Sequence, residues 1–137
     1  MVFFDPARAA NMSERRKRGG HLISKHRFLA AQIEAYLADD LWLELARHAN
    51  AMADRLAAGL AAADLVPVWP VEANEVFVAL PSQVDARLKA AGASYYPWST
   101  DASNGVAPRD ATLVRLVTSF ATTVDEVDRF VAVARAF

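Results

Sequence analysis

Hydrophobic residues recur at helical spacing through the first half of the chain. One stripe predicts a helix from about Ser24 to Ala38 and consists of Phe28, Leu29, Gln32, Ile33, Tyr36 and Leu37. A second stripe predicts a longer helix, capped by Asp39 or Asp40 and ending near Ala62, and consists of Leu41, Leu45, Ala49, Met52, Leu56 and Leu60. Alanine fills much of the rest, which favours helix.

The first residues predict a strand end followed by a helix. Val2 to Phe4 is too short to be a whole buried strand and is interpreted as the end of one. Asp5 is a capping residue, and Pro6 suits the first helical position because its missing N–H needs no partner there. The helix should run to about Lys17, and Gly19-Gly20 should end it.

The second half of the chain alternates strands and helices. Two apolar runs, Glu75–Leu80 and Thr112–Thr118, predict strands, and Ser94–Trp98 predicts an edge strand because Pro97 has no N–H to donate. A short helix over 83–91 should stop at Gly92, and Asn104-Gly105 should reverse the chain. Thr123 followed by Glu126 is a capping box that opens a last helix, with a stripe of Val124, Val127, Phe130, Val131 and Ala134.

This order of elements predicts an α+β fold. A helical linking segment should precede a small C-terminal domain, in which helices cover one face of a three-stranded, mainly antiparallel sheet.

Arg115 is the residue that most suggests function. It interrupts an apolar strand and shares a strand face with Leu113 and Val117, which predicts that its guanidinium is buried. A buried guanidinium needs an anion, and its planar fork matches a carboxylate. Two other interpretations remain at this point, an internal ion pair with Asp or Glu and an edge-strand arginine in water.

Charge is uneven along the chain, although the net charge is −1. Seven basic residues against two acidic ones lie in residues 1–27, which could meet nucleic acid, a phosphate ligand or an acidic neighbour, or could form a solvated helix face. The three histidines do not have metal-ligand spacing, so no metal site is expected. The chain has no cysteine, no apolar run long enough for a membrane span and no secretory signal pattern, which fits a cytoplasmic protein.

Four segments of the sequence, in this order, resemble the middle and later part of bacterial low-specificity L-threonine aldolases: Arg16–Lys25, Phe28–Gln32, Ala73–Val78 and, most specifically, Val114–Thr123. These proteins are fold-type-I pyridoxal-phosphate enzymes related to the β-eliminating lyases. The resemblance implies cleavage of L-threonine or L-allo-threonine to glycine and acetaldehyde, in which the cofactor acts as the electron sink. It also implies the small-domain fold of these enzymes and a homotetramer.

The resemblance implies roles for a few residues. Arg115 matches the arginine that binds the substrate carboxylate, and Lys17 and Arg18 match a basic position near the cofactor phosphate. Many relatives carry a third glycine and Met-Arg-Gln where this chain has His21 to Lys25, so Lys25 or Arg27 is expected to substitute.

The Schiff-base lysine of these enzymes precedes the strand at which this chain starts. Residues 1–22 are therefore interpreted as a remnant of the large cofactor domain, 23–62 as linking helices and 63–137 as the small domain. The isolated chain is expected to be inactive and to bind no cofactor by itself. The alternatives are a non-catalytic oligomerisation partner of a full-length aldolase and, less favoured by the acidic remainder of the chain, a nucleic-acid binder that uses Arg15 to Arg27.

Overall fold

The computed structural model describes residues 4–98, 108 and 110–135. The chain divides into two compact units, Met1–Asp40 and Leu41–Phe137. The predicted strand end at residues 2–4 and the predicted reversal at 104–105 lie wholly or mainly outside the described residues.

The first unit contains only short helices among its described residues. They are the 3-10 helix η1 (Pro6–Ala9), the helices α1 (Met12–Arg18) and α2 (His26–Leu37), and the 3-10 turn η2 (Ala38–Asp40). The carboxylate of Asp5 accepts a hydrogen bond from the amide of Ala7 at 2.9 Å, which confirms the predicted cap. The single helix expected to reach Lys17 is wrong, because the chain breaks at Asn11, which has a left-handed φ of 58°.

The predicted stripe on α2 forms, but the described residues of its own unit do not bury it. No residue of α2 is buried, and its large apolar side chains are between 43% and 60% exposed. Helix α2 begins two residues later than predicted, after Lys25, whose backbone is left-handed.

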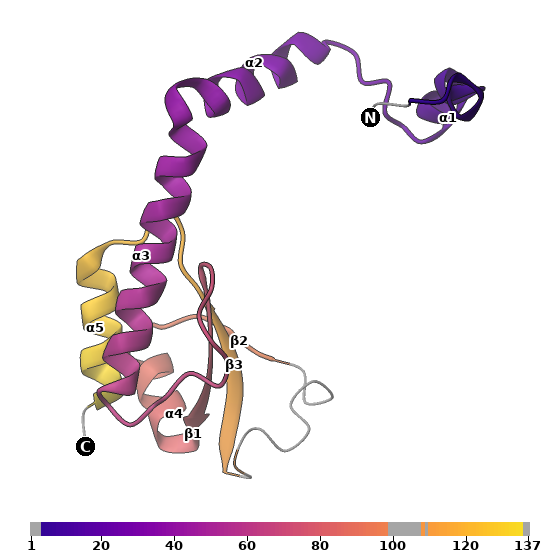
Figure 1. Cartoon of the computed structure of the whole chain (residues 1–137). Helices are drawn as coiled ribbons and strands as arrows, with labels where there is room; N and C mark the ends of the chain where they lie inside the picture. The colour runs from indigo at the N-terminus through magenta and orange to yellow at the C-terminus, as the bar shows by residue number, and fades with distance from the viewer. Residues whose placement is uncertain (1–3, 99–107, 109, 136–137) are drawn as a thin grey trace. The chain divides into compact units, whose positions relative to one another are not determined.

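The second unit is built on the long helix α3 (Leu41–Ala61) and a three-stranded sheet (Figure 1). The strands are β1 (Glu75–Pro81), β2 (Tyr96–Pro97) and β3 (Ala111–Val117), in the order β1-β3-β2, with both pairings antiparallel. Helix α4 (Ser82–Ala90) follows β1, and helix α5 (Val124–Arg135) closes the unit. This arrangement confirms the predicted α+β fold, and β2 is the edge strand expected from Pro97.

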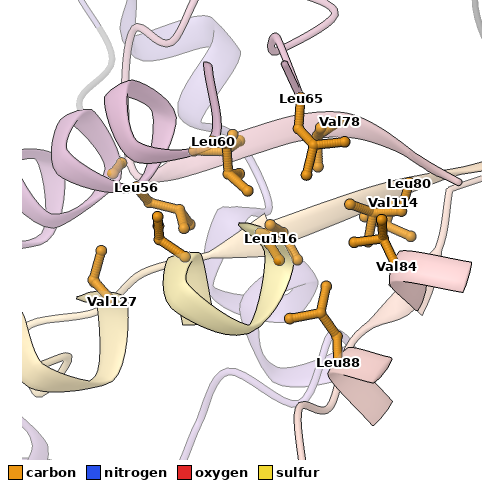
Figure 2. Packing of buried hydrophobic residues seen from close by; sticks show 14 of the residues in the cluster. Leu56, Leu60, Leu65, Val78, Leu80, Val84, Leu88, Val114, Leu116 and Val127 are labelled. Carbon is orange, nitrogen blue, oxygen red and sulfur yellow. The ribbon is translucent and has the colours of Figure 1, made fainter. Parts of the chain in front are cut away.

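One face of the sheet packs against the three helices of this unit. Alternate residues of β1 and of β3 meet side chains of α3, α4 and α5 (Figure 2). The fully buried side chains include Leu60, Val76, Val78, Leu80, Leu88 and Val114. The predicted stripe on α3 is buried from Ala49 onward, whereas Leu41 is exposed. On α5, Val127, Val131 and Ala134 of the predicted stripe are buried, whereas Val124 is exposed.

Local signals at the ends of elements also form as predicted. The amide and hydroxyl of Thr123 donate to the carboxylate of Glu126, and the amide of Glu126 donates to the Thr123 hydroxyl, which is a complete capping box. Helix α4 ends before Gly92, which has a φ of 92°. None of the helices in the described residues is long and apolar enough to cross a membrane.

Candidate functional site

Arg115 projects from the central strand on the face of the sheet opposite the buried core. Its neighbours Val114 and Leu116 point into the core, while Arg115 is paired in register with Phe77 of β1 and Tyr96 of β2. The backbone of a central strand is hydrogen-bonded to a neighbouring strand on each side, so the Cα of Arg115 has a fixed position. The predicted placement of Arg115 on an apolar strand is therefore confirmed.

The predicted burial of Arg115 is wrong. Its side chain is 42% exposed, and Nη1 lies 3.3 Å from Oε1 of Glu75, which is 40% exposed. The helices cover only the other face of the sheet, so alternation along β3 places Arg115 and Val117 toward solvent. The structure therefore agrees with the alternative interpretation in which Arg115 forms an internal ion pair with an acidic side chain. Such a half-exposed pair stabilises a protein by at most about 1 kcal/mol.

Aromatic rings orient the Arg115 side chain. The guanidinium carbon lies 4.9 Å from the centroid of the Trp98 ring. Trp98 meets Phe77 edge to face with centroids 5.2 Å apart, and Phe77 meets Trp69 in the same way at 5.0 Å. A cation over an aromatic face is attracted by the ring, and the fixed row of rings limits where the guanidinium can move.

A cavity of about 810 Å³ has Arg115 among its lining residues, together with Tyr96 and Pro97 of the edge strand β2. Its lining combines a few polar and aromatic side chains, namely Tyr96, Trp98, Arg115, Thr118, Glu126 and Arg129, with apolar residues of α5. A concave, partly apolar site with a few placed cations suits a small carboxylate ligand. Arg129 was not predicted from the sequence, because a single arginine on an exposed helix face gives no signal.

Hydrogen bonds fix the position of the residue that follows β3, Thr118, which lines the cavity. The buried hydroxyl of Thr118 donates to the carbonyl of Ala49 on α3 at 2.7 Å. The side-chain amide of Asn74 donates to the carbonyl of Thr118 at 2.7 Å, and the amide of Thr118 donates to the carbonyl of Asn74 at 3.0 Å. These contacts explain two polar residues that pattern reasoning could not place.

The loop after β3 is held by its own side chains. The amide of Ser119 donates to the hydroxyl of Thr122 at 2.9 Å, and a ring nitrogen of His48 lies 2.8 Å from the carbonyl of Thr122. Bonds from the amide and hydroxyl of Thr123 lower the pKa of Glu126 below its ordinary value. Glu126 is therefore an anion at the cavity rim at neutral pH.

The other predicted site residues lie in the first unit. Lys17 and Arg18 end α1, Lys25 precedes α2, and all three are exposed. Gly20 turns the chain between them with a φ of 73°. The structure thus groups Lys17, Arg18 and Lys25 in Met1–Asp40 and places Arg115 in Leu41–Phe137.

The fold of this chain, with three helices on one face of a three-stranded antiparallel sheet, is similar to part of a known threonine aldolase. No protein-family model matches the chain. Two curated relatives, the low-specificity L-threonine aldolases of Pseudomonas aeruginosa and of a Pseudomonas species, are 41% and 36% identical over 97 residues. In both cases the match covers 70% of this chain and 28% of the relative.

A solved threonine aldolase from Leishmania major has a TM-score of 0.79 and 32% identity, covering 92% of this chain and 35% of that one. The resemblance to low-specificity L-threonine aldolases is therefore confirmed, and the chain is related to part of these proteins. The chain spans little more than a quarter of the length of the curated relatives that it matches.

Proposed function

We propose that this chain is the C-terminal, substrate-carboxylate-binding part of a threonine aldolase-like lyase that depends on pyridoxal phosphate. The substrates would be L-threonine and L-allo-threonine, cleaved to glycine and acetaldehyde. The observation that carries the proposal is the placement of Arg115 on a central strand, against Trp98 and at the rim of a cavity. The likeness to threonine aldolases supports the choice of substrate.

Arg115 is suited to exchange one carboxylate for another. Nη1 of Arg115 lies 3.3 Å from Oε1 of Glu75, and a guanidinium carries five N–H donors, so it has the chemistry to contact a second anion as well. Glu75 keeps the guanidinium oriented while no ligand is bound, and a bidentate amino-acid carboxylate would form the stronger contact. Since both side chains are half exposed, the exchange requires no burial of an unpaired charge.

The basic residues of the first unit fit the phosphate of the cofactor in their chemistry. Lys17, Arg18 and Lys25 are exposed cations, and Lys25 precedes a helix whose first turn has no side-chain cap from that residue. A helix start and two or three cations together favour an anion. When bound, pyridoxal phosphate would supply the electron sink for cleavage of the Cα–Cβ bond.

The chain by itself is proposed to be inactive. It has three lysines, Lys17, Lys25 and Lys89. Nζ of Lys89 lies 2.7 Å from Asp85 and 5.7 Å from the centroid of the Tyr95 ring, so it is engaged in an ion pair. Lys17 and Lys25 are exposed, without the desolvation that makes a lysine nucleophilic.

Borohydride reduction of the purified chain with pyridoxal phosphate, followed by intact mass and peptide mapping, tests the inactivity. The expected result is no adduct, or adducts scattered over the three lysines, together with no acetaldehyde from threonine. A single adducted lysine that is protected by glycine would contradict the proposal, as would measurable cleavage of threonine.

A glycine titration followed by the fluorescence of Trp98 tests the role of Arg115. Trp42 and Trp69 are replaced by Phe so that Trp98 is the remaining tryptophan. Arg115→Gln should abolish the glycine-dependent change, and Arg47→Gln, at an exposed arginine of the same unit that does not line the cavity, is the control that should retain it. An unchanged response in Arg115→Gln would rule out Arg115 as the carboxylate site.

The second candidate function is a non-catalytic partner that joins full-length aldolase subunits. The likeness to threonine aldolases is the observation that motivates this alternative. Co-expression with a tagged full-length relative should then yield a stable complex. A chain that elutes alone beside that enzyme would exclude this function. A cytoplasmic homotetramer stays a prediction from the resemblance.

A further inference from the structure

Glu75 and Arg115 form a pair of opposite charges whose position is set by the sheet. Glu75 is paired in register with Val117, and Arg115 with Phe77, so the two charged residues are diagonal neighbours on one face of adjacent strands. Nη1 of Arg115 lies 3.3 Å from Oε1 of Glu75. All of these residues belong to the unit Leu41–Phe137, so the geometry of the pair is internal to that unit.

Contacts around the pair hold both side chains in place. Asn74, which precedes Glu75, accepts a hydrogen bond from the amide of Thr118 at 3.0 Å and donates one from its side chain to the carbonyl of Thr118 at 2.7 Å. The guanidinium carbon of Arg115 lies 4.9 Å from the centroid of the Trp98 ring. The two charges are therefore placed side by side before any ligand binds, which lowers the entropic cost of binding one.

A free α-amino acid carries the same two charges at a comparable spacing. Its ammonium nitrogen and its carboxylate carbon are about 2.5 Å apart, because both are bonded to Cα. A molecule of this kind can lie antiparallel along the ion pair, with its carboxylate against Arg115 and its ammonium against Glu75. As the ligand carboxylate takes up donors of Arg115, the ammonium gives Glu75 a replacement partner. Neither protein charge is then left without an opposite charge.

Ligands with a single charge fit the pair less well. A simple carboxylate on Arg115 lies beside the like charge of Glu75, and an amine on Glu75 lies beside the like charge of Arg115. We propose that Glu75 is a specificity-determining residue of the Arg115 site, which binds the ammonium group of an amino acid whose carboxylate lies on Arg115. The site thereby selects free zwitterionic amino acids over simple carboxylates. The inference rests on the carboxylate-binding role proposed for Arg115 and adds the partner of the ligand's other charge.

Three small probes separate the two charges of the ligand. Glycine carries both, acetate carries only the carboxylate, and methylammonium carries only the ammonium. Each is titrated into the whole ¹⁵N-labelled chain, and binding is followed by the shifts of the backbone amides of Glu75 and Arg115. Glycine should bind roughly fivefold more tightly than acetate, which is the gain that a half-exposed ion pair gives. Methylammonium should also bind more weakly than glycine.

Glu75→Gln removes one charge of the pair and should remove the preference for the zwitterion. Glycine should bind this variant roughly fivefold more weakly, whereas acetate should bind no more weakly than before. Glu72→Gln, at an exposed glutamate three positions earlier, is the matched control and should keep the preference. The amide spectrum recorded without ligand shows whether each variant is folded. A preference for glycine that survives Glu75→Gln would overturn the proposal.

Arg115→Gln distinguishes this inference from the proposed function, and it should abolish binding of both glycine and acetate. Equal binding of the two probes to the original chain, lost for both in Arg115→Gln, would overturn the role of Glu75 and leave Arg115 as the carboxylate site. Binding of both probes that persists in Arg115→Gln, or no binding to the original chain, would overturn the role of Arg115 and this inference with it.

Discussion

The helices α2 and α3 carry similar apolar stripes, but the stripe of α3 is largely buried and that of α2 is exposed. On α3, Met52, Leu56 and Leu60 are buried against the sheet and α5, whereas on α2 Phe28, Ile33 and Leu37 are each more than half exposed. Periodicity therefore predicts that a helix has an apolar face and says nothing of what covers that face. The covering elements of α3 arrive from residues 75–135, far along the sequence.

The largest expected effect comes from replacing a leucine of α3 by alanine, and the same replacement on α2 is the comparison. Leu60→Ala should lower the free energy of unfolding by about 3 kcal/mol, because Leu60 is fully buried and its loss leaves a cavity. Leu37→Ala, at a side chain that is 54% exposed, should change that free energy by less than about 0.5 kcal/mol in the monomer. Urea unfolding measures both. Equal losses in the free energy of unfolding would mean that the two stripes are buried to the same extent.

The sequence predicted the second unit better than the first for a physical reason. In the described part of residues 41–135 most local signals agree with tertiary packing, so the strands at Glu75 and Ala111, the stop at Gly92 and the capping box at Thr123 all form. In the first unit local preference acts alone, and a left-handed Asn11 divides one expected helix into η1 and α1.

Close packing between α3 and α5 gives the next expected effect. A Cβ added at Gly59 would lie 2.6 Å from a methyl group of Val131, nearer than van der Waals contact allows. Gly59→Ala should therefore destabilise the second unit by about 1 kcal/mol, the clash exceeding the gain in helix propensity. In a double-mutant cycle with Val131→Ala the clash should disappear. Additive effects of the two changes would show that the helices are less closely packed than the structure gives.

Arg115 shows how much of a site a sequence can predict. The polar interruption of an apolar strand indicated the residue and its strand correctly. Its partners Glu75 and Trp98 come from other strands or the edge of the sheet, 40 and 17 positions away, and no periodicity relates them to Arg115. Its exposure depends on which face of the sheet the helices cover, and that is decided by the whole second unit.

A smaller effect is expected from the buried hydroxyl that ties β3 to α3. Thr118→Val should lower the free energy of unfolding by about 1 kcal/mol, because the carbonyl of Ala49 would lose its 2.7 Å donor in a buried place. Thr118→Ser keeps the hydroxyl and is the control for it. Hydrogen exchange at the end of β3 should speed up in the valine variant only. A valine chain as stable as the original would show that water replaces the bond.

The smallest expected effect is electrostatic and concerns the start of α5. This helix has a side-chain cap, whereas the residue that precedes α2 supplies none. Because bonds from Thr123 lower the pKa of Glu126 in the folded chain below its ordinary 4.5, the carboxylate stabilises the fold above that pH. This contribution should disappear as pH falls through the lowered pKa. Glu126→Gln should therefore flatten the acid limb of a stability-against-pH curve. Asp128→Asn is the comparison, since bonds from Arg55 lower the pKa of Asp128 in the same direction. If Glu126→Gln leaves the acid limb unchanged while Asp128→Asn flattens it, the capping box contributes no pH-dependent stability and the Arg55 pair alone carries it.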